Sequence, residues 1–191
     1  MADIRDAVKE AYEEAIENRA ECCSDKLTDM TRNNYAPDAA KLATADVVGQ
    51  SFGCGNPIQA ALLKEGERVL DLGSGAGLDL ILASKAVTQT GHVYGLDMTA
   101  AMLNRARKNI DKLKLKNITL LRGYIEDLPL HDGSVDVLIS NCVINLSPDK
   151  DEVFSEAYRV LADGGRFCVS DVVLLKPVLE KLKSSPAAWS G

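Results

Sequence analysis

The sequence predicts an α/β protein with a Rossmann-like, doubly wound parallel sheet, and three observations lead to this class. Short apolar segments alternate with helical segments between residues 65 and 175. A glycine-rich turn joins the first apolar segment to a helix, and acidic residues follow the next segments. Strands that alternate with helices require right-handed crossovers, which place helices on both faces of a parallel sheet.

The expected elements follow the hydrophobic pattern along the chain. Strands are expected within 68–73, 92–98, 117–125, 135–143 and 166–174. Helices are expected at 78–87, 100–113 and 149–161, and Asp163-Gly164-Gly165 is expected to end the last one. We expect the strand order 3-2-1-4-5, which brings the carboxyl ends of the first strands to one edge of the sheet.

The chain divides into three expected regions. Residues 1–64 form an N-terminal lid, with an amphipathic helix at 3–20 and a short helix at 57–64. Residues 65–175 form the sheet domain. Residues 176–191 form a short helical tail, which is expected to begin a missing C-terminal part. We expect the first helix to lie over the ligand side of the sheet.

Composition limits the class of partner. The 191 residues are 46% hydrophobic and carry a net charge of −6, which argues against a nucleic-acid partner because such partners favour a basic face. There is no apolar run of membrane-spanning length, and the N-terminus is too acidic for a signal peptide, so a cytoplasmic protein is expected. The five cysteines are an odd number, which argues against a disulfide framework.

The glycine-rich turn reads "DLGSGAGLD", with Gly73, Gly75 and Gly77 in alternation. Glycines at this place allow a tight turn and a close approach of the backbone to a ligand. The spacing differs from the Gly-x-Gly-x-x-Gly of dinucleotide-binding proteins, so a dinucleotide oxidoreductase is disfavoured. Asp71 immediately precedes the loop, and a carboxylate there suits a cation or an ammonium group better than a pyrophosphate.

Acidic residues follow the second and third strands. Asp97 ends the second strand, where a carboxylate accepts hydrogen bonds from ribose hydroxyl groups. Ile125 is placed to pack on an adenine face, with Glu126 at its edge. Asp97 could instead cap the helix that starts near Thr99, and Glu126 could be a solvated turn residue. The order of loop and acidic strand ends favours an adenosine site.

At this point the sequence resembles the class I S-adenosylmethionine-dependent methyltransferases over about residues 65–175, and "LDLGSGAG" carries the resemblance. The resemblance implies that Asp71 and the 73–77 loop hold the methionine part of the cofactor, and that Asp97 holds its ribose. The cofactor-binding residues expected on this basis are Asp71, Gly73, Ser74, Gly75, Gly77, Asp97, Met98, Ile125, Glu126 and Asn141.

Four further motifs resemble those of arsenite methyltransferases: "FGCGNP", "GLDMTAAML", "SNCVINLSPDK" and "EAYRVLADGGRFCVSDV". The resemblance implies that Cys54 and Cys142 bind trivalent arsenic, with Cys22 or Cys23 as an upstream third thiol. Thiolates suit arsenic because it is thiophilic, and its lone pair can attack a methyl carbon without a general base. An external thiol reductant is the implied partner, and Cys168 is expected in the core.

The chain departs from that family after its fifth strand. Such enzymes have further strands and another arsenic-binding cysteine there, so this chain is expected to be truncated at its C-terminus. An uncovered fifth strand would then offer an edge for dimer formation. Two other functions stay open: a methyltransferase for a small organic acceptor, and a non-catalytic module that binds metalloids. An incidental surface position is equally open for Cys22 and Cys23.

Overall fold

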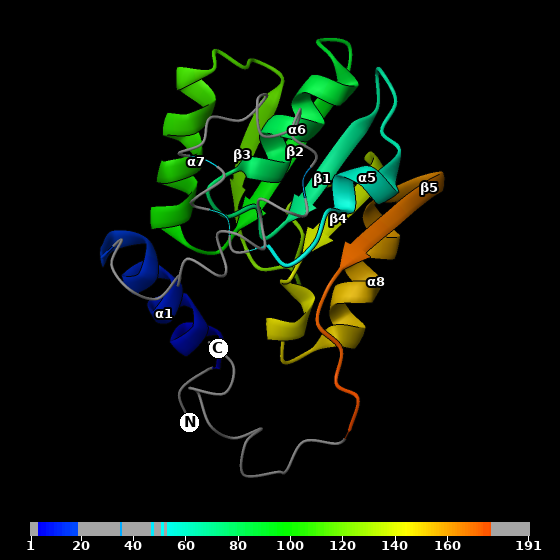
Figure 1. Cartoon of the computed structure of the whole chain (residues 1–191). Helices are drawn as coiled ribbons and strands as arrows, with labels where there is room; N and C mark the ends of the chain where they lie inside the picture. The colour runs from blue at the N-terminus through cyan, green and yellow to red at the C-terminus, as the bar shows by residue number, and fades with distance from the viewer. Residues whose placement is uncertain (1–3, 19–34, 36–46, 48–50, 52, 177–191) are drawn as a thin grey trace.

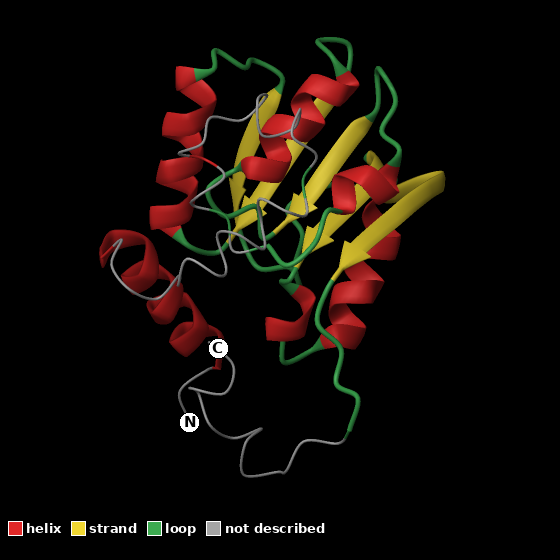
Figure 2. Cartoon of the chain, viewed as in Figure 1, coloured by secondary structure: helices red, strands yellow, loops and turns green. Residues whose placement is uncertain are grey.

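A computed structural model describes residues 4–18, 35, 47, 51 and 53–176. The described chain forms a five-stranded, fully parallel sheet in the order β3-β2-β1-β4-β5, as predicted (Figures 1 and 2). The strands are β1 (Arg68–Leu72), β2 (His92–Asp97), β3 (Ile118–Arg122), β4 (Val135–Asn141) and β5 (Leu161–Ser170). The order reverses between β1 and β4, and ligands of open α/β sheets bind at such a switch point.

Helices cover both faces of the sheet because successive strand residues point to opposite sides. On one face, Val69, Val93 and Ile139 pack against three helices: α5 (Pro57–Ala61), α6 (Leu78–Val87) and α7 (Ala100–Lys112). On the other face, Leu70 and Leu138 pack against α8 (Lys150–Val160) and the 3₁₀ turn η1 (Ile144–Leu146). The predicted three-layer architecture is therefore confirmed.

The fifth strand differs from its prediction. The segment Asp163-Gly164-Gly165 does not follow a helix end; α8 ends at Val160, and Leu161 is already extended. The pairing with β4 is irregular there: Val135 lies opposite Leu161, whereas Val137 lies opposite Arg166. Gly164 has a φ of 76°, so the two glycines form a bulge inside β5. The strand also ends earlier than expected, at Ser170.

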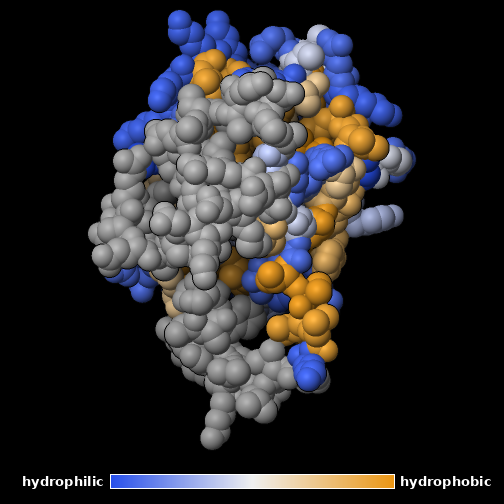
Figure 3. Space-filling view, viewed as in Figure 1, coloured by the Kyte–Doolittle hydropathy of each residue, from blue (hydrophilic) through white to orange (hydrophobic). Residues whose placement is uncertain are grey.

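Beyond β5 the chain exposes apolar side chains. Val172, Val173, Leu174 and Leu175 are 62–92% exposed. Figure 3 shows apolar colour gathered at this end of the described chain. Within the described residues, β5 pairs with β4 and with no other strand, so its second edge is open. None of the helices in the described ranges is long and apolar enough to cross a membrane.

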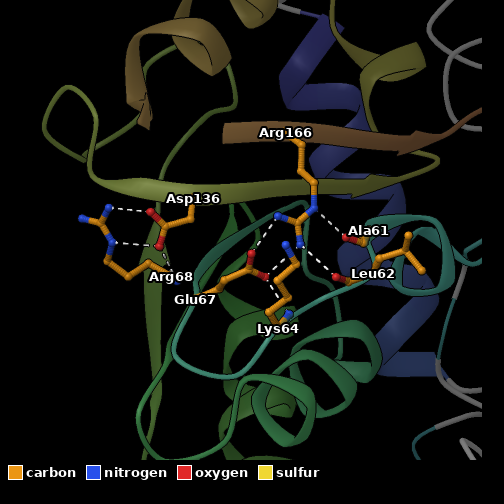
Figure 4. Close-up of polar contacts among 7 residues, drawn as sticks. All are labelled: Ala61, Leu62, Lys64, Glu67, Arg68, Asp136 and Arg166. Carbon is orange, nitrogen blue, oxygen red and sulfur yellow. Dashed lines mark hydrogen bonds and ion pairs between the residues drawn. The ribbon is translucent and has the colours of Figure 1, made fainter. Parts of the chain in front are cut away.

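A cluster of charges anchors the short helix α5 to the sheet. Arg166 of β5 donates to both carboxylate oxygens of Glu67 at 2.8 Å, and to the carbonyl oxygens of Ala61 at 2.6 Å and Leu62 at 3.1 Å (Figure 4). These carbonyl groups end α5, where no intrahelical donor is available. Arg166 therefore fixes the helix that directly follows the segment carrying Cys54.

The N-terminal helix α1 (Ile4–Asn18) lies beside α7 and reaches the carboxyl ends of the strands. Val8 is only 1% exposed, and the Arg5 guanidinium lies 5.0 Å from the ring centre of Tyr124, in the segment after β3. A guanidinium over an aromatic face is a favourable cation–π contact. The predicted position of this helix is confirmed.

Candidate functional site

A pocket lies at the carboxyl ends of β1, β2 and β4, beneath α1. Most of the residues expected to bind a cofactor line it: Asp71, Gly73, Ser74, Gly75, Asp97, Met98, Ile125, Glu126 and Asn141, together with Cys142. Arg5, Val8 and Tyr12 of α1 complete its wall. The sheet order therefore gathers residues that are scattered over more than 70 positions of the sequence.

Asp71 is a buried carboxylate at the end of β1. It is 2% exposed, and its Oδ2 atom has no hydrogen-bond partner among the described residues. Burial raises its pKa well above the usual range, and the negative charges of Asp79 and Asp97 add to the effect. An unpaired carboxylate in a pocket is costly, and a bound cation or ammonium group would remove that cost.

Asp97 supports the glycine loop as well as lining the pocket. Its Oδ2 accepts from the backbone N–H of Gly75 at 2.9 Å, and its Oδ1 accepts from that of Thr99 at 2.8 Å. Burial raises its pKa, and these hydrogen bonds act in the opposite direction. Asp97 therefore also stabilises the start of α7, which is the alternative role that the sequence left open. A carboxylate has about four acceptor positions, so Asp97 can still accept a further donor beside Gly75 and Thr99.

The glycine loop opens toward the pocket at Gly75. This residue has a φ of 51°, and a Cβ atom built on it meets nothing within 4 Å. Gly73 has a φ of 66° and packs closely against the side chain of Val143. Gly77 differs from the expectation: it is not among the lining residues, and its Cα faces Ala106 of α7. Gly77 instead allows α6 to pack closely against α7.

Glu126 lines the pocket from the turn after β3. Its carboxylate accepts a hydrogen bond from the Ser147 hydroxyl at 2.5 Å. Ile125 packs against the core on the α8 face while also lining the pocket. Glu126 is therefore a half-buried turn residue with a hydrogen bond to Ser147, and its place at the adenine edge stays a prediction.

Cys54 and Cys142 lie together at the β4 end. They form a disulfide, with Cα atoms 6.0 Å apart and a sequence separation of 88. A single bridge is not the disulfide framework that the odd cysteine count argues against, and a count cannot show which loops the fold brings together. Cys142 has a φ of 58°, a conformation that costs a non-glycine residue about 1–2 kcal/mol. That backbone turns the strand end toward the Cys54 loop.

The other polar residues of "SNCVINLSPDK" hold the turn after β4. Asn145 donates from its amide to Asp171 at 2.7 Å, which ties η1 to the segment after β5. Asp149 caps α8 by accepting from the backbone N–H of Glu152 at 3.1 Å. The Lys150 ammonium donates to the Ser147 carbonyl at 2.8 Å. These contacts explain why the strand end is followed by amides and hydroxyls.

Two residues near the cysteine pair were not predicted. Tyr35 is 3% exposed and donates from its hydroxyl to Asp79 Oδ1 at 2.7 Å; Asp79 starts α6 and is 7% exposed. The amide of Asn141 donates to Asp79 Oδ2 and to the Tyr35 hydroxyl, both at 3.1 Å. Burial raises the pKa of Asp79, while these two donors act in the opposite direction. No local pattern signals contacts between residues so far apart in the sequence.

Of the other three cysteines, the structure describes Cys168 alone. Cys168 is a free thiol, half-buried against the core on the α5 face, as expected. Cys22 and Cys23 lie outside the described residues. No group of three or more metal-ligating side chains occurs among the residues that the structure describes.

A parallel sheet in this order, with a glycine loop and acidic strand ends around one pocket, defines the class I methyltransferase type of Rossmann-like fold. A family model described as a methyltransferase domain matches residues 63–191, and the chain belongs to that family.

The resemblance to arsenite methyltransferases is also confirmed. The chain is 44% identical over 171 residues to the arsenite methyltransferase of Halobacterium salinarum, covering 89% of this chain and 44% of the relative. It is 34% identical over 205 residues to that of Homo sapiens, covering 99% and 54%. The crystal structure of an arsenic(III) S-adenosylmethionine methyltransferase from Chlamydomonas reinhardtii is similar, with a TM-score of 0.70 and 45% identity, over 80% of this chain and 55% of that one. The chain thus spans about half the length of the curated relatives.

Proposed function

We propose that the chain is an S-adenosylmethionine-dependent methyltransferase that acts on trivalent arsenic held by Cys54 and Cys142. The observation that carries this proposal is the position of the cysteine pair, which joins the β4 end to the loop at Gly53 beside the pocket. Cys142 and Gly53 both line that pocket. A thiophilic substrate and a methyl donor would therefore meet at one place.

The pocket residues suit S-adenosylmethionine. The unpaired Oδ2 of Asp71 would accept the ammonium group of its methionine part, and the open side of Gly75 leaves room for it. Asp97 would accept from the ribose hydroxyls, and Ile125 and Met98 would contact the adenine. When bound, the cofactor supplies a methyl group on a sulfonium centre, whose positive charge suits a pocket with several carboxylates.

The cysteine pair suits arsenite when it is reduced. Two thiols and arsenous acid combine into a dithiolate with loss of two water molecules, whereas a disulfide has no thiolate to offer. An external thiol reductant fits this need: two external thiols give two electrons and two protons to the disulfide and leave as one disulfide. The pocket lining contains no histidine among the described residues, which suits a nucleophile that needs no general base. Cys22 or Cys23 remains the proposed third thiol.

Arsenite titration of the reduced chain tests this proposal. We expect binding to be lost, by at least about tenfold in affinity, in Cys54→Ser and in Cys142→Ser, since each removes one of two ligands. Cys168→Ser is the matched control and should bind like the parent. If Cys168→Ser alone abolished binding, or if no variant changed it, the methyltransferase for a small organic acceptor would be the better assignment.

A further inference from the structure

The two cysteines belong to segments that have no regular secondary structure in common. Cys54 lies in the turn between residues 53 and 56, and Cys142 lies just after β4. A disulfide can hold such segments together, but it is absent once the pair is reduced. Arsenite needs the reduced pair, so another contact must keep the thiols adjacent in that state.

Asn141 makes that contact with the residue next to Cys54. The backbone N–H of Gly55 donates to Asn141 Oδ1 at 3.1 Å, and Asn141 Nδ2 donates to the Gly55 carbonyl at 3.0 Å. The side chain of the residue before Cys142 thus satisfies both backbone groups of the residue after Cys54. This double contact resembles the pairing of two adjacent strands and fixes both position and direction.

Asp79 and Tyr35 determine which way the amide faces. Both oxygens of Asp79 accept here, one from Asn141 Nδ2 and the other from the Tyr35 hydroxyl. The Tyr35 hydroxyl also lies 3.1 Å from Asn141 Nδ2, and since this nitrogen has only two hydrogens for three acceptors, one of them is shared in a three-centre bond. The amide nitrogen must therefore face Asp79, which leaves Oδ1 facing the Gly55 N–H. All of these contacts are buried or half-buried, where an unsatisfied polar group is costly.

The glycines around Cys54 fit this network by their small size. A Cβ atom on Gly53 would overlap the Asn141 amide, and one on Gly55 would overlap the Ser170 hydroxyl. Neither glycine is among the described residues with positive φ, so their role is close packing rather than backbone conformation. Cys54, between these two glycines, is half-buried.

We propose that Asn141, oriented by Asp79 and Tyr35, is a positioning residue that keeps the Cys54 and Cys142 thiols adjacent in the reduced protein. The positioning role concerns the cysteine pair itself. Only its consequence for arsenite affinity rests on the proposed function. In this role the Asn141 amide bonds groups of the protein itself. Its expected role as a cofactor ligand stays a prediction.

The redox equilibrium of the pair with glutathione tests the positioning role without cofactor or arsenic. The dithiol reduces one oxidised glutathione to two glutathione molecules and becomes the disulfide, so the equilibrium constant measures the effective concentration of one thiol at the other. We expect Asn141→Ala, in the full 191-residue chain, to lower this constant about tenfold or more. Tyr35→Phe, which removes only one hydroxyl, should lower it about two- to fivefold.

Asn145→Ala is the matched control, because it truncates the same residue type near the same cysteine, yet its amide bonds Asp171 instead of the Cys54 loop. It should stay within about twofold of the parent. Parent-like constants in both Asn141→Ala and Tyr35→Phe would overturn the proposal. If Asn141→Ala does not fold, as judged by circular dichroism, Tyr35→Phe alone decides, with a parent-like value overturning it.

Arsenite affinity of the same reduced variants separates the two proposals. Weaker binding in Asn141→Ala, by a factor similar to the redox change, supports both. A lowered redox constant in a protein whose parent binds no arsenite would support the positioning role and contradict the proposed substrate. Arsenite binding by the parent together with an unchanged redox constant in both variants would support the proposed substrate and contradict the positioning role.

Discussion

At the scale of single residues, the site depends on polar groups that the fold leaves in unfavourable surroundings. Asp71 is buried beside two other carboxylates with one oxygen unpaired, and Cys142 adopts a left-handed backbone conformation. Local strain of this kind tends to collect at binding sites, where a ligand offsets it. Asp71 is therefore expected to lower the stability of the free protein while raising its affinity for a cationic ligand.

Asp71→Asn should separate these two effects. Because the folded-state pKa of Asp71 is raised, the folded chain keeps the proton to a higher pH than the unfolded chain does. Its contribution to stability is thus lost as pH rises from the usual range of aspartate through the raised folded pKa. We expect Asp71→Asn to stabilise the free protein at neutral pH by about 1–3 kcal/mol, and by less as the pH falls toward the usual aspartate range.

The same variant should bind S-adenosylhomocysteine about 10- to 100-fold more weakly, because a charged acceptor for the ammonium group is lost. Thermal unfolding at several pH values and calorimetry measure the two effects. An Asp71→Asn protein that was less stable at neutral pH, or that bound the product with parent affinity, would remove Asp71 from the assigned role.

At the scale of elements, the site is the meeting point of three segments: the Cys54 turn with α5, the glycine loop with α6, and the β4 end with η1. The first of these segments is tied to the sheet by two side chains from other parts of the chain. Asn141 at the end of β4 bonds the Cys54 turn, and Arg166 of β5 bonds the end of α5. Arg166 lies outside the pocket lining, so we expect the thiol geometry to depend on a contact outside the pocket.

Arg166→Met should loosen α5 while keeping much of the apolar stem. We expect a loss of about 1–3 kcal/mol in unfolding free energy, because the Glu67 carboxylate and two carbonyl groups lose their donor. The redox constant of the cysteine pair should also fall. Arg68→Met is the control, since Arg68 makes a similar pair with Asp136, at 2.7 Å, away from α5 (Figure 4). Denaturant unfolding measures the loss of stability, and equilibration with glutathione measures the redox constant. Equal effects of both variants on the redox constant would contradict the role of Arg166 in holding α5.

Elements could be predicted from the sequence where the pattern that defines them is local. The prediction failed where the structure depends on contacts between distant residues. The helix 78–87 follows from an apolar run after the glycine loop and is observed with those bounds. The Gly164-Gly165 pair predicted a helix end, but the open edge of β5 tolerates the same residues as a bulge. Asp71 and Asp97 follow from strand ends, whereas Tyr35 and Asp79 reach Asn141 over 106 and 62 residues and have no local signal.

At the scale of the whole molecule, the described chain combines a pocket at the carboxyl ends of its strands with an open sheet edge. The pocket draws on α1, the glycine loop and the ends of β1, β2 and β4. The second edge of β5 and the apolar residues after it are uncovered within the described ranges. An open strand edge with exposed apolar side chains favours pairing with another chain.

Self-association through that edge stays a prediction from the sequence. We expect light scattering after size exclusion to show a concentration-dependent dimer in the micromolar range. The double variant Val172→Lys with Leu174→Lys, just after β5, should shift it toward monomer, because lysines beside an open strand edge oppose pairing. Tyr158→Lys on α8 changes an exposed aromatic residue away from this segment and serves as the comparison. A parent that stays monomeric at all concentrations tested would rule the prediction out.

The most direct test of the central claim, that the cysteine pair and the pocket form one active site, is transfer of a labelled methyl group. The reduced 191-residue chain is incubated with arsenite and S-adenosylmethionine carrying an isotopically labelled methyl group, and arsenic species are separated and detected by mass. The account predicts labelled methylarsenic from the parent and from Cys168→Ser, and at least about 100-fold less from Cys54→Ser and Cys142→Ser. Binding of both arsenite and S-adenosylhomocysteine without any labelled methylarsenic from the parent would contradict it, and would favour a non-catalytic metalloid-binding module.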